Sequence, residues 1–299
     1  MGMSDMGQGL RLPEQRKGRQ GAGRAVRLLL LALLLTASYS LIQDAIMVLL
    51  GELFYEEQLE WMDRLPFLLD SLLTLPLFFL YGWGYCYFFR GRTGAPGLSA
   101  EDFTLRHFGL CLLYALGALG ISNLWFVLLE HVLLPNAFWQ ESLDSFSEAW
   151  DGVQPGDYPF MLFSTVLLGP VVEEILFRGL IINVLDRVRR GMMPAIVSGL
   201  LFGLFHMEPV QVVYTALLGI VLGIVYERTR RLDITITIHI LNNFLTEAAG
   251  WLPTDALYEW LVLFEMLLCL PLLYSVDTVR RTGSFRFRRA GASDTIEII

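Results

Sequence analysis

The chain has 299 residues, of which 55% are hydrophobic and 17% are charged, and its formal net charge is −8. Because a soluble globular domain normally carries about 25% charged residues, this composition argues against a soluble protein and favours a multi-pass membrane protein. Three cysteines, Cys86, Cys111 and Cys269, have neither disulfide-framework nor metal-ligand spacing, so a cysteine-based scaffold is not expected.

Eight apolar segments have a length and composition compatible with membrane-spanning helices. They cover residues 26–50, 65–89, 107–134, 159–186, 193–208, 209–227, 233–249 and 256–276. The sequence therefore predicts an all-α, polytopic membrane helix bundle with about eight transmembrane helices. We expect a disordered basic cytoplasmic arm over residues 1–25, a transmembrane helical domain over 26–280 and a cytoplasmic tail over 281–299.

The distribution of basic residues predicts the orientation of this bundle. With eight spans, nearly all of the 22 basic residues fall on one side of the membrane, whereas Arg64 lies opposite and Arg178 lies within a span. By the positive-inside rule, both termini are then cytoplasmic. Lys17 is the single lysine, which indicates GC-rich coding, and together with the short loops this favours a prokaryotic inner or plasma membrane.

The fourth span carries ionisable side chains in its middle, within the stretch Val171-Val172-Glu173-Glu174-Ile175-Leu176-Phe177-Arg178. Each such group costs about 2.5–3.5 kcal/mol at a membrane centre on insertion scales, so it normally faces the protein interior or a water-filled cavity. Glu174 and Arg178 are four residues apart and share a helical face, which predicts an ion pair. Glu173 is rotated by about 100° and is therefore expected to remain free for chemistry.

Two later spans carry further polar side chains. His206 ends the pattern Phe202-Gly203-Leu204-Phe205-His206, and His239 and Asn243 lie four residues apart on one helical face. These groups can converge with the glutamates in one cavity, entered from the cytoplasm or from the lipid. Each feature also has a purely structural interpretation, as an ion-pair tether, a helix cap or interhelical hydrogen bonding.

The ordered set Glu-Glu-x-x-x-Arg, Phe-x-x-x-His and His-x-x-x-Asn resembles the CAAX protease and bacteriocin-processing (CPBP) family. That family includes the Ras-converting type of prenyl-protein endopeptidase and many bacterial Abi-type proteins. The resemblance covers a catalytic core of about residues 159–249. It implies an intramembrane endopeptidase in which Glu173 is the general base and His206 its partner in activating a water. It further implies that His239 and Asn243 stabilise the oxyanion, while Glu174 and Arg178 hold the geometry.

The chemistry of these side chains agrees with that implication. Burial of a carboxylic acid moves it towards the range in which it can act as a general base near neutral pH. Asn and His can supply donors to a developing oxyanion. We expect no cofactor; the alternative is a catalytic zinc held by Glu and two His, although the sequence has no His-Glu-x-x-His pattern.

A non-catalytic membrane scaffold or immunity-type protein is the other alternative. The expected partners are the lipid bilayer and a membrane-associated peptide or protein substrate, with no nucleic acid. The sequence does not determine whether that substrate is prenylated, nor the oligomeric state of the protein.

Overall fold

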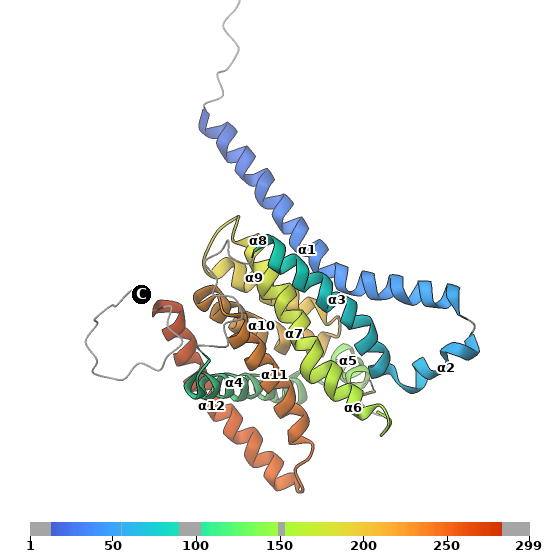
Figure 1. Ribbon diagram of the computed structural model, residues 1–299. Helices are drawn as coiled ribbons and strands as arrows, with labels where there is room; N and C mark the ends of the chain where they lie inside the picture. Colours follow the sequence, from blue (N-terminus) through green and yellow to red (C-terminus); the bar gives the residue numbers. More distant parts are fainter. Residues whose placement is uncertain (1–12, 55, 90–102, 149–152, 283–299) are drawn as a thin grey trace, which may run out of the picture.

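A computed structural model describes residues 13–54, 56–89, 103–148 and 153–282 of the chain, and these residues form helices and no strand. The α-helices are α1 Pro13–Leu53, α2 Glu56–Arg64, α3 Pro66–Phe88, α4 Leu105–Leu128, α5 Ala137–Glu148, α6 Tyr158–Met161, α7 Gly169–Glu174, α8 Asn183–Leu185, α9 Met192–Phe205, α10 Pro209–Thr229, α11 Leu232–Ala249 and α12 Asp255–Thr282. Three π-helical segments are η2 Leu129–Leu133, η3 Leu162–Leu168 and η4 Ile175–Ile182. The all-α fold class is thus confirmed for the described residues (Figure 1).

Six of the described helices are long and apolar enough to cross a membrane, and the chain is a multi-pass integral membrane protein. They are Gly23–Leu53, Pro66–Phe88, Leu105–Leu133, Tyr158–Leu185, Pro209–Thr229 and Asp255–Thr282. The other two expected spans correspond to α9, which has 14 residues, and to α11, which has 18. At 1.5 Å per residue, α9 is about 21 Å long, which is shorter than the ~30 Å hydrocarbon core of a membrane. Helix α11 is longer, but its polar residues lower its mean hydropathy.

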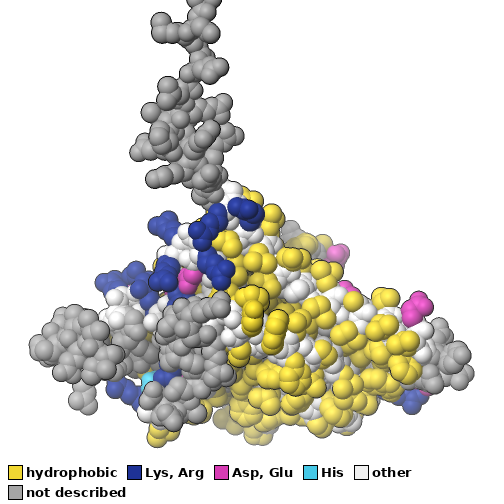
Figure 2. Space-filling model, turned by 45° about the horizontal axis from the view of Figure 1, so that its top comes forward, with side chains coloured by type: hydrophobic (Ala, Val, Ile, Leu, Met, Phe, Trp, Pro, Cys, Tyr) yellow, Lys and Arg dark blue, Asp and Glu magenta, His cyan; other side chains and the backbone are white. Residues whose placement is uncertain are grey.

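The ends of the chain differ in part from the sequence-based boundaries. Helix α1 begins at Pro13, so residues 13–25 of the expected disordered arm are helical. Residues 1–12 and the expected tail beyond Thr282 lie outside the described residues. Figure 2 shows Lys and Arg side chains gathered at one end of the face in view, whereas hydrophobic side chains cover most of the rest. Such a face is expected of a protein that meets lipid along its sides.

The helix from Tyr158 to Leu185 alternates between α- and π-geometry, and the sequence accounts for the π-turn at the end of η3. Pro170 has no backbone N–H and its ring clashes with the carbonyl one turn earlier in a regular α-helix. The N–H of Gly169 accordingly bonds to the carbonyl of Ser164, five residues back. A Cβ atom at Gly169 would lie 2.9 Å from that same oxygen, so glycine fits this close approach. Such π-turns occur frequently at functional sites.

The described helices pack into two apolar cores, and the alternating helix belongs to the first. Helix α3 runs beside it (Figure 1), and their side chains form one apolar core with α1 and α9. A second core joins α4, α10, α11 and α12. Helices α9 and α10 form a tight hairpin, because a Cβ atom at Gly199 would lie 2.4 Å from the backbone nitrogen of Ile220. Small residues at such contacts let helix backbones approach closely in a membrane.

Candidate active site

Glu174 and Arg178 form the predicted ion pair in the middle of the Tyr158–Leu185 helix. Glu174 Oε1 lies 2.8 Å from Arg178 Nη1, and both side chains are completely buried. Arg178 Nη2 also donates to the carbonyl oxygen of Gly219 in α10, at 3.1 Å. The guanidinium lies 4.8 Å from the ring centroid of Phe202 in α9, in cation–π geometry. Arg178 therefore joins the fourth span to both helices of the α9–α10 hairpin.

His239 lies between the two glutamates. Its Nδ1 is 3.1 Å from Glu174 Oε1, and its Nε2 is 3.7 Å from Glu173 Oε2. A carboxylate only accepts hydrogen bonds, so Nδ1 carries a proton and donates it to Glu174. The family resemblance implies that His239 stabilises the oxyanion together with Asn243. In the fold, however, α11 packs against α7, which brings both imidazole nitrogens to carboxylates.

Glu173 has different surroundings from its neighbour, as expected from the rotation between consecutive helical residues. Its side chain is 14% exposed, whereas that of Glu174 is fully buried. Its Oε1 lies over Gly169, 3.8 Å from the position that a Cβ atom there would occupy. Among the described residues, the basic side chain within 4 Å of its carboxylate is that of His239 and not that of Arg178. Glu173 is therefore the carboxylate of the pair that a substrate or a water can reach.

His206 follows the last residue of α9 and is half-buried. Its Nδ1 lies 2.8 Å from the carbonyl oxygen of Phe202 and donates to it, so Nε2 carries the lone pair. Its ring packs edge-to-face on that of Phe202 at 4.9 Å, and the His239 ring packs on the same Phe202 at 5.6 Å. Both histidines thus meet at one phenylalanine. Within the described part of the chain, no hydrogen bond joins His206 directly to Glu173.

Asn243 donates a hydrogen bond to a backbone carbonyl that has no donor within its own helix because of the π-turn. Its Nδ2 donates to the carbonyl oxygen of Thr165, at 2.8 Å. The N–H of Gly169 bonds to Ser164 instead, and Pro170 has no N–H, so neither residue that would normally reach Thr165 does so. One amide hydrogen of Asn243 is used in this way, and the second remains for another acceptor. The Asn243 Oδ1 accepts from the buried Asn242, at 3.2 Å.

The described residues contain no group of three or more His, Cys, Asp or Glu side chains that could hold a metal ion. Both nitrogens of His239 are directed at carboxylates, and His206 uses Nδ1 on its own helix.

Several residues that shape the site could not be predicted from the sequence. The carbonyls of Thr165 and Gly219 and the ring of Phe202 act through tertiary contacts that no residue spacing predicts. Tyr39 of α1 packs its ring on Phe205 at 4.9 Å, so the first span also forms part of the surroundings. The one available signal was Gly169-Pro170 inside an apolar span, because proline there disturbs a regular helix.

The part of the chain that holds this network matches known sequences. Residues 155–245 match the family described as type II CAAX prenyl endopeptidase Rce1-like, and this range contains all six predicted site residues. This part of the chain is similar to that family. The α1–α5 region and α12 lie outside the match.

A curated relative from Bacillus subtilis (strain 168), named "Putative membrane peptidase YdiL", is 27% identical over 85 residues. The match covers 28% of this chain and 35% of the relative, so only about a third of that protein is represented. No solved structure gave a significant match.

Proposed function

We propose that this protein is an intramembrane endopeptidase that uses water to hydrolyse a peptide bond of a membrane-associated peptide or protein. The observation that carries the proposal is the pair of adjacent glutamates with different surroundings. Glu174 is buried on Arg178, whereas Glu173 is partly accessible and faces His239. Two neighbouring carboxylates in different environments are suited to different roles, one structural and one chemical.

In the proposed mechanism Glu173 removes a proton from the attacking water. The Nε2 lone pair of His206 can accept the second hydrogen of that water, because Nδ1 already donates to Phe202. The water oxygen forms a bond to the scissile carbonyl carbon, and the carbonyl electrons move to oxygen. Glu173 then returns its proton to the amide nitrogen as the C–N bond breaks. His239, held through Nδ1 by Glu174, places its Nε2 3.7 Å from Glu173 Oε2, where a protonated Nε2 can donate to that carboxylate.

The remaining N–H of Asn243 is the proposed donor to the oxyanion. Its Thr165 bond fixes the plane of the amide, so the second hydrogen has a set direction before substrate binds. A donor oriented in advance stabilises developing charge without reorganisation during the reaction. His239 can also donate a hydrogen bond to the oxyanion if its Nε2 is protonated during turnover.

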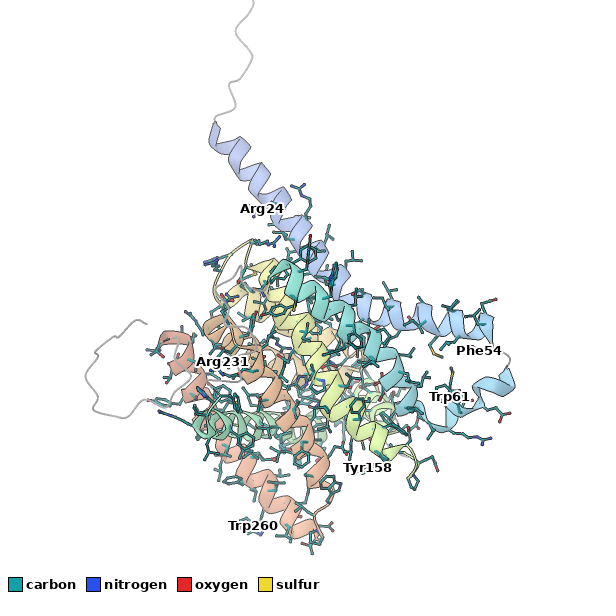
Figure 3. All side chains as sticks on the ribbon, viewed as in Figure 1. Arg24, Phe54, Trp61, Tyr158, Arg231 and Trp260 are labelled. Carbon is teal, nitrogen blue, oxygen red and sulfur yellow. The ribbon has the colours of Figure 1, made fainter. Side chains whose placement is uncertain are left out.

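The proposed topology has eight crossings and cytoplasmic termini, in a prokaryotic inner or plasma membrane. Arg24 and Arg231 lie towards one end of the bundle, and Tyr158 and Trp260 lie towards the other (Figure 3), in agreement with the positive-inside rule. In this arrangement residues 26–280 form the membrane domain around a catalytic core of about 159–249. A bacterial relative supports the prokaryotic assignment.

The proposal is tested by comparing membrane proteomes from cells with the wild-type protein and with Glu173→Gln. We expect a small set of membrane proteins or peptides to lose a cleaved form in the variant. Glu265→Gln is the matched control, because Glu265 is also a buried glutamate within a span but bonds to Asn123, away from the site. Identical cleavage patterns in wild type and Glu173→Gln would contradict the proposal, and loss of cleavage on chelation would favour the zinc alternative.

A further inference from the structure

The chain reverses direction directly after His206 through a turn of unusual geometry. Met207 has φ = 63°, although it is not glycine, and its side chain is 83% exposed. The N–H of Glu208 bonds to the carbonyl oxygen of His206, at 2.7 Å, so the three residues form a γ-turn. A γ-turn with positive φ at its centre is rare and strained for a residue that carries a Cβ atom. Such a conformation persists only where surrounding contacts hold it.

Helix α5 supplies those contacts from outside the matched region. Ser142 donates a hydrogen bond to Glu208 Oε1, and Ser145 donates one to Glu208 Oε2 at 3.1 Å. The same Ser142 oxygen accepts the backbone N–H of Val210, at 3.1 Å. Trp125 of α4 donates through Nε1 to the carbonyl of Val210, at 3.0 Å. Both arms of the Glu208 carboxylate and the following backbone are thus attached to neighbouring helices.

The role of Glu208 differs from that of an ordinary helix cap. It occupies the N-cap position of α10, but its side chain makes no capping hydrogen bond to that helix. Ser142 accepts the N–H of Val210 in its place, which leaves the carboxylate directed at α5. Hydrogen bonds to a charged acceptor are stronger than neutral ones, so this arrangement is suited to hold a strained turn.

We propose that Glu208, Ser142 and Ser145 form a positioning device that fixes the backbone of His206 and thereby directs its Nε2 into the active site. The proposal rests on the proposed function of His206. The ring is oriented by the Phe202 carbonyl on the helical side, and the γ-turn fixes its backbone on the other side. A part of the chain outside the family match therefore sets the geometry of a residue inside it.

The test uses two variants of the positioning device, Glu208→Gln and the double variant Ser142→Ala/Ser145→Ala. Each is compared with a second protein that carries the same change together with Met207→Gly. Glycine adopts positive φ without strain, so Met207→Gly removes the need for the device. Ser147→Ala is the matched control, because Ser147 is an exposed serine of the same helix. Two quantities are measured on each purified protein: the hydrogen exchange of the amides over residues 206–212, and turnover of a substrate found in the Glu173→Gln comparison.

We expect the device variants to exchange several-fold faster over residues 206–212 and to lose turnover by as much as about a hundredfold, since small displacements of catalytic groups have effects of this order. Adding Met207→Gly should restore both quantities, and Ser147→Ala should change neither. If these hydrogen bonds only stabilise the packing of α5 on the α9–α10 hairpin, Met207→Gly would restore neither the exchange rate nor turnover.

Unchanged exchange in the device variants would overturn the proposal, as would faster exchange with full turnover or a failure of Met207→Gly to rescue. The exchange measurement needs no substrate, so it decides whether the device holds the turn even if Glu173→Gln shows no loss of cleavage. If Glu173→Gln shows no loss of cleavage, the proposed function is removed, and the positioning device then has no catalytic purpose.

Discussion

At the scale of single residues, the site depends on two adjacent glutamates with separate tasks. Their difference could be predicted from sequence, because consecutive helical residues point about 100° apart and Glu174 is one turn from Arg178. The position of His239 between both carboxylates could not be predicted, because it depends on how α11 packs on α7. Local spacing gives contacts within a helix, whereas contacts between helices require the tertiary structure.

The two glutamates should respond differently to the same substitution. Glu174→Gln leaves the guanidinium of Arg178 buried without its counter-ion, and we expect a loss of about 3–5 kcal/mol in stability. Glu173→Gln should keep the fold and abolish cleavage, because Glu173 is partly exposed and has no guanidinium partner. Thermal unfolding in detergent, measured beside turnover on the same preparations, checks both expectations. Equal destabilisation by the two changes would contradict this division.

Asn243→Ala should affect both stability and turnover. It leaves the Thr165 carbonyl without its donor, which costs about 1–3 kcal/mol, and it removes the proposed oxyanion donor, which costs roughly 10²–10³ in turnover. Asn243→Asp should be at least as harmful, because it places acceptors against the carbonyl and the oxyanion. Asn242 is an unsuitable control since it donates to Asn243. Thr246→Ala serves instead, because Thr246 bonds only within α11. Full turnover per folded Asn243→Ala molecule would leave Asn243 a structural role alone.

At the scale of elements, the alternation of α- and π-geometry in the fourth span links sequence to site. The span itself is predictable from its apolar run, but hydropathy contains no information about a π-turn. The end of α9 at Phe205 likewise differs from the expected span to residue 208, because the strained turn at Met207 begins there. Both departures from regular geometry adjoin proposed catalytic residues.

Pro170→Ala tests the purpose of the π-turn. The alanine N–H can bond to the Val166 carbonyl, four residues back, and the Gly169 N–H can then return to the Thr165 carbonyl in competition with Asn243. The helix can thus become regular and rotate Glu173 away from its position. We expect a folded protein with turnover lowered at least tenfold, of the order that misplaced catalytic groups produce. Turnover and the thermal midpoint are measured together. A fully active Pro170→Ala protein would show that the π-turn is incidental to catalysis.

At the scale of the whole molecule, apolar runs indicate a multi-pass membrane protein, and six of the described helices meet the length and hydropathy expected of spans. Whether α9 and α11 also cross depends on the surrounding protein, since α9 is short and α11 is polar. Buried helices next to a polar site need not be apolar enough to face lipid, so hydropathy alone does not count them reliably.

The eight-span topology makes a prediction about accessibility from each side of the membrane. In a chain with the exposed Cys86 replaced by Ser, a cysteine at Ser147 should react with a membrane-impermeant maleimide from the outer side only. A cysteine at Arg189 should react from the cytoplasmic side only. Labelling of intact cells and of inverted vesicles measures both. Reaction of the Ser147 cysteine from the cytoplasmic side would exclude the proposed orientation.

The most direct test of the central claim is hydrolysis by the purified, lipid-reconstituted protein in H₂¹⁸O. The wild-type protein should cleave a substrate identified by the membrane comparison and place one ¹⁸O atom in the new carboxyl terminus, as measured by mass spectrometry. The folded Glu173→Gln protein should bind the same substrate and release no product. Product formation by Glu173→Gln at the wild-type rate would contradict the account, because water would then be activated without the base on which the mechanism depends.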